Sequence, residues 1–286
     1  MAELVEWVVG PYDFTFMRRA LLVLAIISVV SGVVGTFVIH KGLAFSGDAL
    51  AHSTLAGVAV AFVSGMNVSL GALGAAVVTA LGIAWTRDRA RVSYDTAIGI
   101  LFVAMFSIGV LVLSTRQSYT PDLFSFVFGD ILGISRSDVL GAAILGLAVL
   151  VFLAAFSREL LFVAYDPLMA RATGVPTRFF EYAMVVVVGV AVVVALKAIG
   201  IVLVNAMLII PPAAAALLVT RLPRIMLLAI VFAIASSAIG MHLSFHLGVA
   251  ASPAIVIVAC AIFVAALIAS RWRRTAAESP ELGAVA

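Results

Sequence analysis

The stretch on which the fold depends reads GDALAHSTLAG, residues 47–57. It places two ionisable side chains, Asp48 and His52, in a run from Leu43 to Val63 that contains no other. Residues four apart on a helix project from one face, so the two side chains could bind one ion or each other. A charge or an unpartnered polar group in hydrocarbon costs several kcal/mol. We therefore expect a functional pair, with a structural hydrogen bond that fixes the local backbone as the alternative.

The composition is that of an integral membrane protein. Of the 286 residues, 65% are hydrophobic and 11% are charged, and the mean hydropathy is +1.27. Such a chain can hold eight or nine spans of about 20 residues with short loops, which leaves no room for a separate soluble domain. We expect an all-α, polytopic membrane helical bundle whose energy-coupling domain, if it has one, is another chain.

Charge, cysteine content and motifs exclude several other classes. The net charge is +3, but the arginines stand at the ends of apolar runs, as the positive-inside rule expects, so we predict a lipid bilayer and not nucleic acid as the partner. The single cysteine, Cys260, excludes a disulfide within one chain. The acidic opening MAELVEW does not fit a signal peptide. We find no catalytic set and no G-x-x-x-x-G-K-[ST] motif, so we do not expect an enzyme.

Apolar runs predict the spans. The run 182–219 is too long for one crossing, and we expect two that turn near Lys197 and Gly200, with Pro211 and Pro212 breaking or kinking the second. Residues 1–16 are rich in aromatic side chains and predict an interfacial lead-in, 116–137 an extracytoplasmic loop with a short interfacial helix, and 271–286 a cytoplasmic tail. The other expected spans are 20–39, 43–64, 68–85, 97–113, 139–156, 225–245 and 253–270.

Counting charges leaves two topologies. If Arg18 and Arg19 are cytoplasmic, as the cluster Arg87–Arg91 is, three full crossings cannot lie between them. One segment must then be broken or re-entrant, and we favour 43–64, in which Gly47 and Gly57 could act as hinges, as Pro211 and Pro212 could later in the chain. The alternative is nine complete spans with an external N-terminus.

A second polar pair, His242 and His246, repeats the four-residue spacing near the expected outer end of a span. Imidazole and carboxylate together suit zinc and manganese, whereas calcium and magnesium prefer oxygen alone and copper(I) prefers sulfur. We predict a metal pathway that uses Asp48, His52, His242 and His246. The alternative for the second pair is a helix end that faces lipid headgroups. In the re-entrant topology the two pairs could meet, whereas nine full spans would make them successive stations.

Several segments resemble one family, the permease subunits of bacterial ABC importers for zinc and manganese. The resemblance covers about residues 16–270. The segments that carry it are MRRAL at 17–21, GTFV at 35–38, GDALAH at 47–52, GVA at 57–59, Asp166-Pro167 with Ala170 and Gly174-Val175-Pro176, GIVLV at 200–204 with Ile210-Pro211, and SFHL at 244–247 with Pro253.

The resemblance implies a type II ABC importer-like permease domain at 17–270 in the bacterial cytoplasmic (inner) membrane. Its cytoplasmic segment 158–180, with Asp166, Pro167, Ala170 and Gly174, would dock on an ATPase. The implied partners are a second copy of the chain, a dimer of separate ATPase chains and an extracytoplasmic metal-binding protein. The implied cargo is Mn²⁺ or Zn²⁺, with no permanently bound cofactor.

Two further functions are open on the residues alone. A proton-coupled secondary transporter would use Asp48 or His52 as a proton relay and would need no ATPase. A siderophore or vitamin permease of similar architecture would have a wide pathway without clustered ligands.

Overall fold

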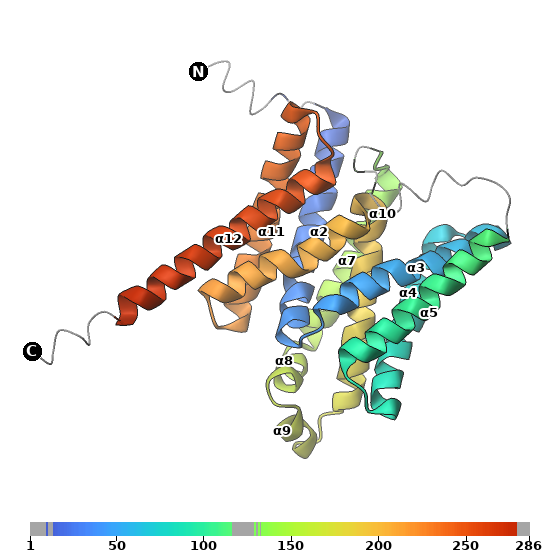
Figure 1. The fold of residues 1–286 in the computed structure, drawn as a ribbon, viewed down its shortest axis with the longest axis horizontal. Coiled ribbons are helices and arrows are strands. Elements are labelled where there is room, and N and C mark those ends of the chain that lie inside the picture. The colour runs from blue at the N-terminus through green and yellow to red at the C-terminus, as the bar shows by residue number, and fades with distance from the viewer. Residues whose placement is uncertain (1–9, 11–13, 116–128, 130, 132, 279–286) are drawn as a thin grey trace, which may run out of the picture.

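The chain is described by a computed structural model that covers residues 10, 14–115, 129, 131 and 133–278. These residues contain no β-strand and form ten α-helices, shown in Figure 1. The helices are α2 (Thr15–His40), α3 (Ala44–Ser64), α4 (Val68–Ala90), α5 (Tyr94–Ser114), α7 (Arg136–Ala155), α8 (Ser157–Tyr165), α9 (Pro167–Ala172), α10 (Thr177–Leu218), α11 (Leu222–Leu247) and α12 (Ala251–Glu278).

The described helices supply nine segments that are long and apolar enough to cross a membrane, if α10 is counted as two, Thr177–Leu196 and Ala198–Leu218. α3 is one of the nine and is an uninterrupted helix of 21 residues. This continuity contradicts the favoured expectation of a broken or re-entrant segment at 43–64. The all-α bundle is confirmed, and the alternative of nine complete spans fits the structure.

Nine crossings also resolve the conflict between the basic clusters. Every odd-numbered crossing ends on the same side of the membrane, and the positive-inside rule assigns that side to the cytoplasm. Arg18 and Arg19, in the first turns of α2, then lie at the outer end of the bundle. The basic residues that follow the third, fifth, seventh and ninth crossings are Arg87 to Arg91, Arg158, Arg221 with Arg224, and Arg271.

α2 and α10 form the centre of the bundle. α3, α4 and α5 pack together on one side of this centre, and α11 and α12 pack on the other (Figure 1). α7 lies against α2 and α10. Buried apolar side chains from both sides join in one core, so the two groups of helices are held through α2 and α10.

The long helix α10 turns where the sequence predicted. Gly200 has φ 76° and ψ 166°, a conformation that glycine adopts readily and other residues avoid. The helix continues through Pro211 and Pro212 to Leu218, so the expected break there is wrong, whereas a kink or hinge at the two prolines stays a prediction. Pro212 has no N–H for the carbonyl of Leu208, four residues before it. That carbonyl lies so close to Gly35 of α2 that a Cβ there would collide with it, which shows how a neighbouring helix covers the freed group.

The glycine in the middle of α3 serves close packing in this structure. A Cβ on Gly57 would collide with the carbonyl oxygen of Gly71 on α4, and a Cβ on Gly71 would collide with that of Gly57. Small residues let helices approach closely in a membrane, where lipid tails remove the hydrophobic drive for association. The structure thus gives Gly57 a packing role within regular helix, whereas its action as a hinge stays a prediction.

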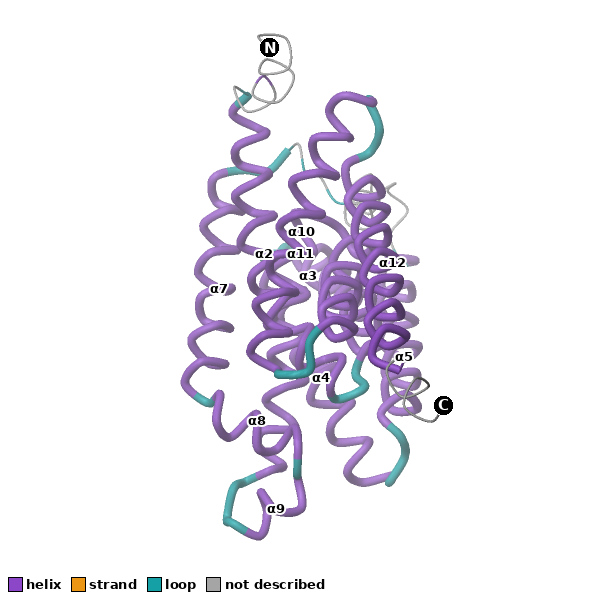
Figure 2. The backbone as a smooth tube through the Cα atoms, turned by 90° about the vertical axis from the view of Figure 1, so that its left-hand side faces the viewer, coloured by secondary structure: helices purple, strands orange, loops and turns teal. Residues whose placement is uncertain are grey.

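Short helices and the chain ends complete the fold. α8 and α9 follow the fifth span and form a protrusion at the lower end of the molecule (Figure 2). Of the expected lead-in, residues 1–9 and 11–13 lie outside the described residues, as do 116–128 of the expected extracytoplasmic loop. At the other end of the chain, α12 extends to Glu278, beyond the expected start of the tail at residue 271.

We predict that Gly57→Ala lowers the stability of the detergent-solubilised protein by about 1–3 kcal/mol, the usual cost of overpacking a core. The matched control is Gly74→Ala on α4, where an added Cβ meets nothing within 4 Å. Thermal unfolding followed by size-exclusion chromatography measures both. Equal melting temperatures for the two variants would contradict the close contact of α3 with α4.

Candidate metal site in the membrane

Asp48 and His52 lie on one face of α3, as their spacing predicts. The distance from His52 Nε2 to Asp48 Oδ1 is 3.6 Å, and the exposed fractions of the two side chains are 32% and 51%. Both are therefore accessible in the single chain, although they belong to a helix that crosses the membrane. Such exposure of a carboxylate in a span requires water, an ion or another subunit beside it.

Asn205 of α10 is the polar partner of Asp48. Its Nδ2 donates a hydrogen bond to Asp48 Oδ1 over 2.6 Å. Its Oδ1 is buried and has no hydrogen-bond partner among the described residues. Gly47 makes room for this amide, because a Cβ at that position would lie 3.2 Å from Asn205 Oδ1. The site thus joins the start of α3 to the second half of α10, shortly after the kink at Gly200.

Asn205 is not among the site residues predicted from the sequence. The signal was present, since Asn205 is the one amide and the one strongly polar side chain in the apolar run from Ala198 to Leu218. A lone amide in hydrocarbon is costly for the same reason that a lone carboxylate is. What the sequence does not contain is the pairing of residue 205 with residue 48, which depends on the turn of α10.

Two aromatic rings of α5 hold the imidazole of His52. The ring centroids of Phe102 and Phe106 lie 5.5 and 6.2 Å from that of His52, both in edge-on geometry, and the two phenyl rings lie 6.1 Å apart. These contacts restrict the orientation of the imidazole and exclude water from one side of it. The other side faces Asp48.

The donors are chemically suited to a first-row dication. A carboxylate oxygen, an amide oxygen and an imidazole nitrogen match the ligand preferences of manganese and zinc. The described residues of one chain do not bring three His, Cys, Asp or Glu side chains together. Asp48, His52 and Asn205 of one chain therefore do not by themselves make a complete ligand set among the described residues.

The second predicted pair lies elsewhere. The ring centroids of His242 and His246 are 4.6 Å apart near the end of α11. The neighbouring Phe245 contacts Phe14, just before the start of α2, with ring centroids 5.8 Å apart. α3 begins beyond the opposite end of α2. Within one chain, the two pairs therefore lie towards opposite ends of α2 and do not form one site, as the nine-span topology requires.

The four residues expected to dock on an ATPase all lie in or beside α9. The carboxylate of Asp166 caps α9 by accepting from the N–H groups of Leu168 and Met169, and Pro167 is the first residue of the helix. Ala170 is fully buried and Gly174 has φ 87°. These four residues determine the shape of the segment. The exposed apolar side chains of the segment are those of Leu168, Met169 and Tyr165.

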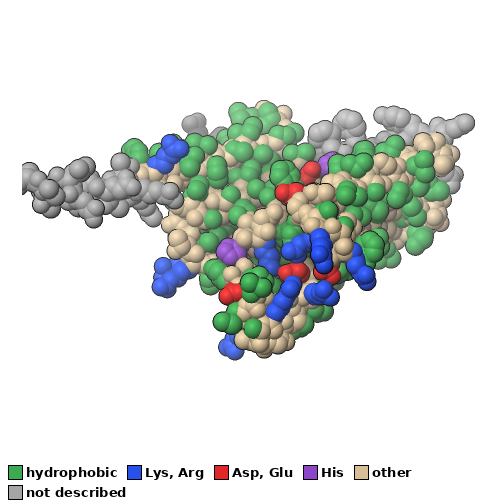
Figure 3. Space-filling model, turned by 60° about the horizontal axis from the view of Figure 1, so that its bottom comes forward, with side chains coloured by type: hydrophobic (Ala, Val, Ile, Leu, Met, Phe, Trp, Pro, Cys, Tyr) green, Lys and Arg blue, Asp and Glu red, His purple; other side chains and the backbone are tan. Residues whose placement is uncertain are grey.

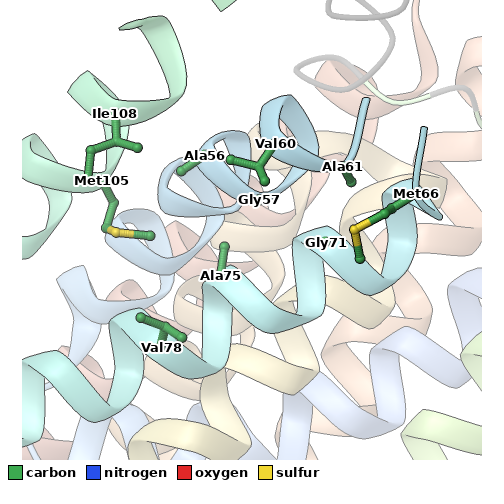
Figure 4. A pocket seen from close by; sticks show the side chains of 10 residues that line it. All are labelled: Ala56, Gly57, Val60, Ala61, Met66, Gly71, Ala75, Val78, Met105 and Ile108. Carbon is green, nitrogen blue, oxygen red and sulfur yellow. The ribbon is translucent and has the colours of Figure 1, made fainter. Parts of the chain in front are cut away.

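An apolar hollow of about 280 Å³ begins one turn after His52, between α3, α4 and α5 (Figure 4). Its lining includes Ala56, Gly57, Ala75 and Met105 and is almost entirely apolar. Since it offers no donor to a cation, we do not assign it to the metal pathway.

Comparison with known proteins agrees with the family that the motifs suggested. Residues 13–270 match the model of the ABC 3 transport family. The manganese transport system membrane protein MntC of Listeria innocua is 38% identical over 259 residues, which cover 91% of this chain and 92% of that protein. A probable iron transport system membrane protein of Haemophilus influenzae is 31% identical, with 94% and 98% coverage.

The fold agrees as well. The solved structure of PsaBC from Streptococcus pneumoniae in complex with Fab has a chain with a TM-score of 0.81 and 31% identity, and the match covers 92% of this chain and 95% of that chain. The family expected from the sequence motifs is therefore confirmed. The chain belongs to the ABC 3 transport family of membrane permeases and is a multi-pass integral protein of the bacterial inner membrane.

Proposed function

We propose that the chain is the permease subunit of an ATP-driven importer of Mn²⁺, and that Asp48, His52 and Asn205 line its pathway. The observation that carries the proposal is the Asn205–Asp48 hydrogen bond beside His52, which gathers three metal-binding side chain types in the apolar part of the bundle. As a permease, the chain moves the ion and catalyses no bond making or breaking itself.

Manganese is the preferred cargo for two reasons. Three relatives that are 37–38% identical to this chain are named as manganese transport proteins. In addition, Asp48 offers carboxylate oxygen, the donor that manganese favours more than zinc does. Zinc, and the iron named for the Haemophilus relative, are the competing cargoes. The Irving–Williams order favours both over manganese at a site of this kind, so selectivity has to come from geometry or from delivery.

A second copy of the chain supports the pathway in this proposal. Asp48 and His52 are open in the single chain, and a dication needs more ligands than one chain supplies here. Two copies that face each other through α3 would bring two carboxylates and two imidazoles together. They would also cover an exposed charge that would otherwise face lipid. Few ligands from each copy would bind the ion firmly enough to offset its dehydration and still release it.

The other two partners fit the two ends of the molecule. An ATPase dimer would dock on α8 and α9, where Leu168 and Met169 stand exposed on the cytoplasmic side. An extracytoplasmic binding protein would deliver the ion at the opposite end, where His242 and His246 provide an outer station. Asp48 and His52 would then receive the ion deeper in the bundle.

We predict that Asp48→Asn and His52→Ala each lower Mn²⁺ uptake by at least about tenfold and that Asn205→Ala lowers it by about tenfold, as loss of a ligand or of its supporting hydrogen bond does elsewhere. Uptake of radioactive manganese into proteoliposomes with the ATPase and the binding protein measures this. The control is Asp95→Asn, an exposed carboxylate in the first turn of α5. Unchanged uptake in Asp48→Asn and His52→Ala would refute the site.

We predict that Leu168→Ser prevents the ATPase from co-purifying with the permease, because it removes an apolar contact at the centre of the exposed surface of α9. Leu247→Ser is the control, since the two leucines are similarly exposed, at 77% and 68%, and Leu247 lies at the opposite end of the molecule. Binding of the ATPase in detergent measures the difference. Equal recovery of the ATPase with both variants would argue against docking on α9.

A further inference from the structure

A cluster of charged and polar side chains joins α4, α5 and α10 at the cytoplasmic end. Arg87, near the end of α4, donates to Glu181 in α10 over 2.9 Å and to the hydroxyl of Tyr94, the first residue of α5, over 2.6 Å. Its guanidinium carbon also lies 3.9 Å from the centre of the Tyr94 ring. Figure 3 brings this end forward and shows basic and acidic side chains gathered there.

Lys41 extends the cluster to the ATPase-docking segment. It lies in the loop between α2 and α3, and its Nζ donates to the carbonyl of Val163 in α8 over 3.4 Å. The pKa of Lys41 is lowered, mainly by burial. The Glu181 carboxylate acts to raise it, and Arg87 acts to lower it. Lys41 therefore lies within electrostatic reach of the Arg87–Glu181 pair. The hydrogen bond from Lys41 to Val163 joins α8, which would move with the ATPase, to the loop before α3.

Movement of α8 and α9 would have to pass through α10, α4 and α5 to reach the metal site. α10 starts at Thr177, a few residues after the end of α9 at Ala172, so displacement of α9 reaches the first turns of α10 directly. α4 and α5 are the helices that pack most extensively on α3, which carries Asp48 and His52. Arg87 is bonded to both sides of this junction, because it holds Glu181 on α10 and Tyr94 on α5.

We propose that the Arg87–Glu181 pair is the mechanical link between the α8–α9 segment and the helices that carry the metal site. With the pair intact, movement of the start of α10 pulls the ends of α4 and α5 with it, and α3 follows. The proposal rests on the proposed function, since it assumes that an ATPase acts on α8 and α9. Arg87 and Glu181 are positioning residues in this scheme and do not touch the ion.

The surroundings of the pair favour this role over that of a solvated surface contact. The Glu181 side chain is only 17% exposed, so its charge is poorly screened and its loss leaves Arg87 without a counter-ion. A second ion pair joins the same two helices, Arg178 to Asp88 at 3.7 Å, but both side chains are more exposed. Exposed pairs of this kind contribute little. Arg178 and Asp88 therefore provide matched controls on α4 and α10.

The experiment measures the number of Mn²⁺ ions transported per ATP hydrolysed, in proteoliposomes that contain the complete complex and Mn²⁺-loaded binding protein. We expect Glu181→Gln and Arg87→Gln to lower this ratio by about fivefold or more, the lower end of typical coupling between distant sites. ATP hydrolysis should continue in both variants. Asp88→Asn and Arg178→Gln should change the ratio by no more than about twofold.

A double-mutant cycle tests whether the two residues act as one unit. If they do, the double variant Arg87→Gln with Glu181→Gln lowers the ratio no further than either single change does. An unchanged ratio, an effect equal to that of the Asp88 and Arg178 controls, or losses that multiply in the double variant would each overturn the proposal. A parallel fall in ATP hydrolysis, transport and melting temperature at constant ratio would also overturn it, by showing a structural role alone.

The failure of this proposal differs from the failure of the proposed function. Asp48→Asn should lower Mn²⁺ transport by at least about tenfold. Glu181→Gln should leave the rise in melting temperature that Mn²⁺ causes at its wild-type value. If Asp48→Asn transports normally, the metal site is wrong whatever the Glu181 variant does. If Glu181→Gln alone behaves as wild type, the proposed metal site is retained and the proposed mechanical link is refuted.

Discussion

The hydrogen bond from Asn205 to Asp48 is the interaction on which the geometry of the candidate site depends. A carboxylate in an apolar span must find a partner, and here the partner comes from a helix that follows far later in the chain. Two glycines make the meeting possible. Gly200 turns α10 so that its second half crosses α3, and Gly47 leaves room for the amide. The position of the candidate site therefore follows from backbone features as much as from its ligands.

Close approach of helix backbones at glycines also holds the helices around the site together. Gly57 and Gly71 bring α3 and α4 into contact, and Gly35 lets α2 lie against the carbonyl of Leu208. In lipid, such contacts replace the hydrophobic drive that a soluble core would use. The contact at Leu208 also places another helix over the carbonyl that Pro212 leaves without its usual donor.

The sequence predicted most of the fold and about half of the candidate site. Apolar runs predicted the spans. The run 182–219 is too long for one crossing of the bilayer, and with Gly200 inside it this length predicted the turn in α10. The favoured topology was wrong at 43–64, since a single pair, Arg18 and Arg19, was given too much weight against an otherwise ordinary apolar helix. Asn205 was missed because its pairing with Asp48 depends on two helices crossing, which no local pattern records.

The nine-span topology places the site close to the cytoplasmic cluster. Asp48 follows Lys41 by seven residues, about 10 Å along a helix, and Lys41 contacts α8. In the proposed function, a movement of α8 and α9 would thus have to be transmitted over only a short distance to reach Asp48 and His52. The outer histidines lie at the far end of α2, a helix of 26 residues and about 39 Å. Any conformational change that acts on the outer end of the proposed pathway must therefore be transmitted along α2, or through α10 to α11. The packing of both helices on α2 makes that central helix the element through which the two ends of the pathway can respond to each other.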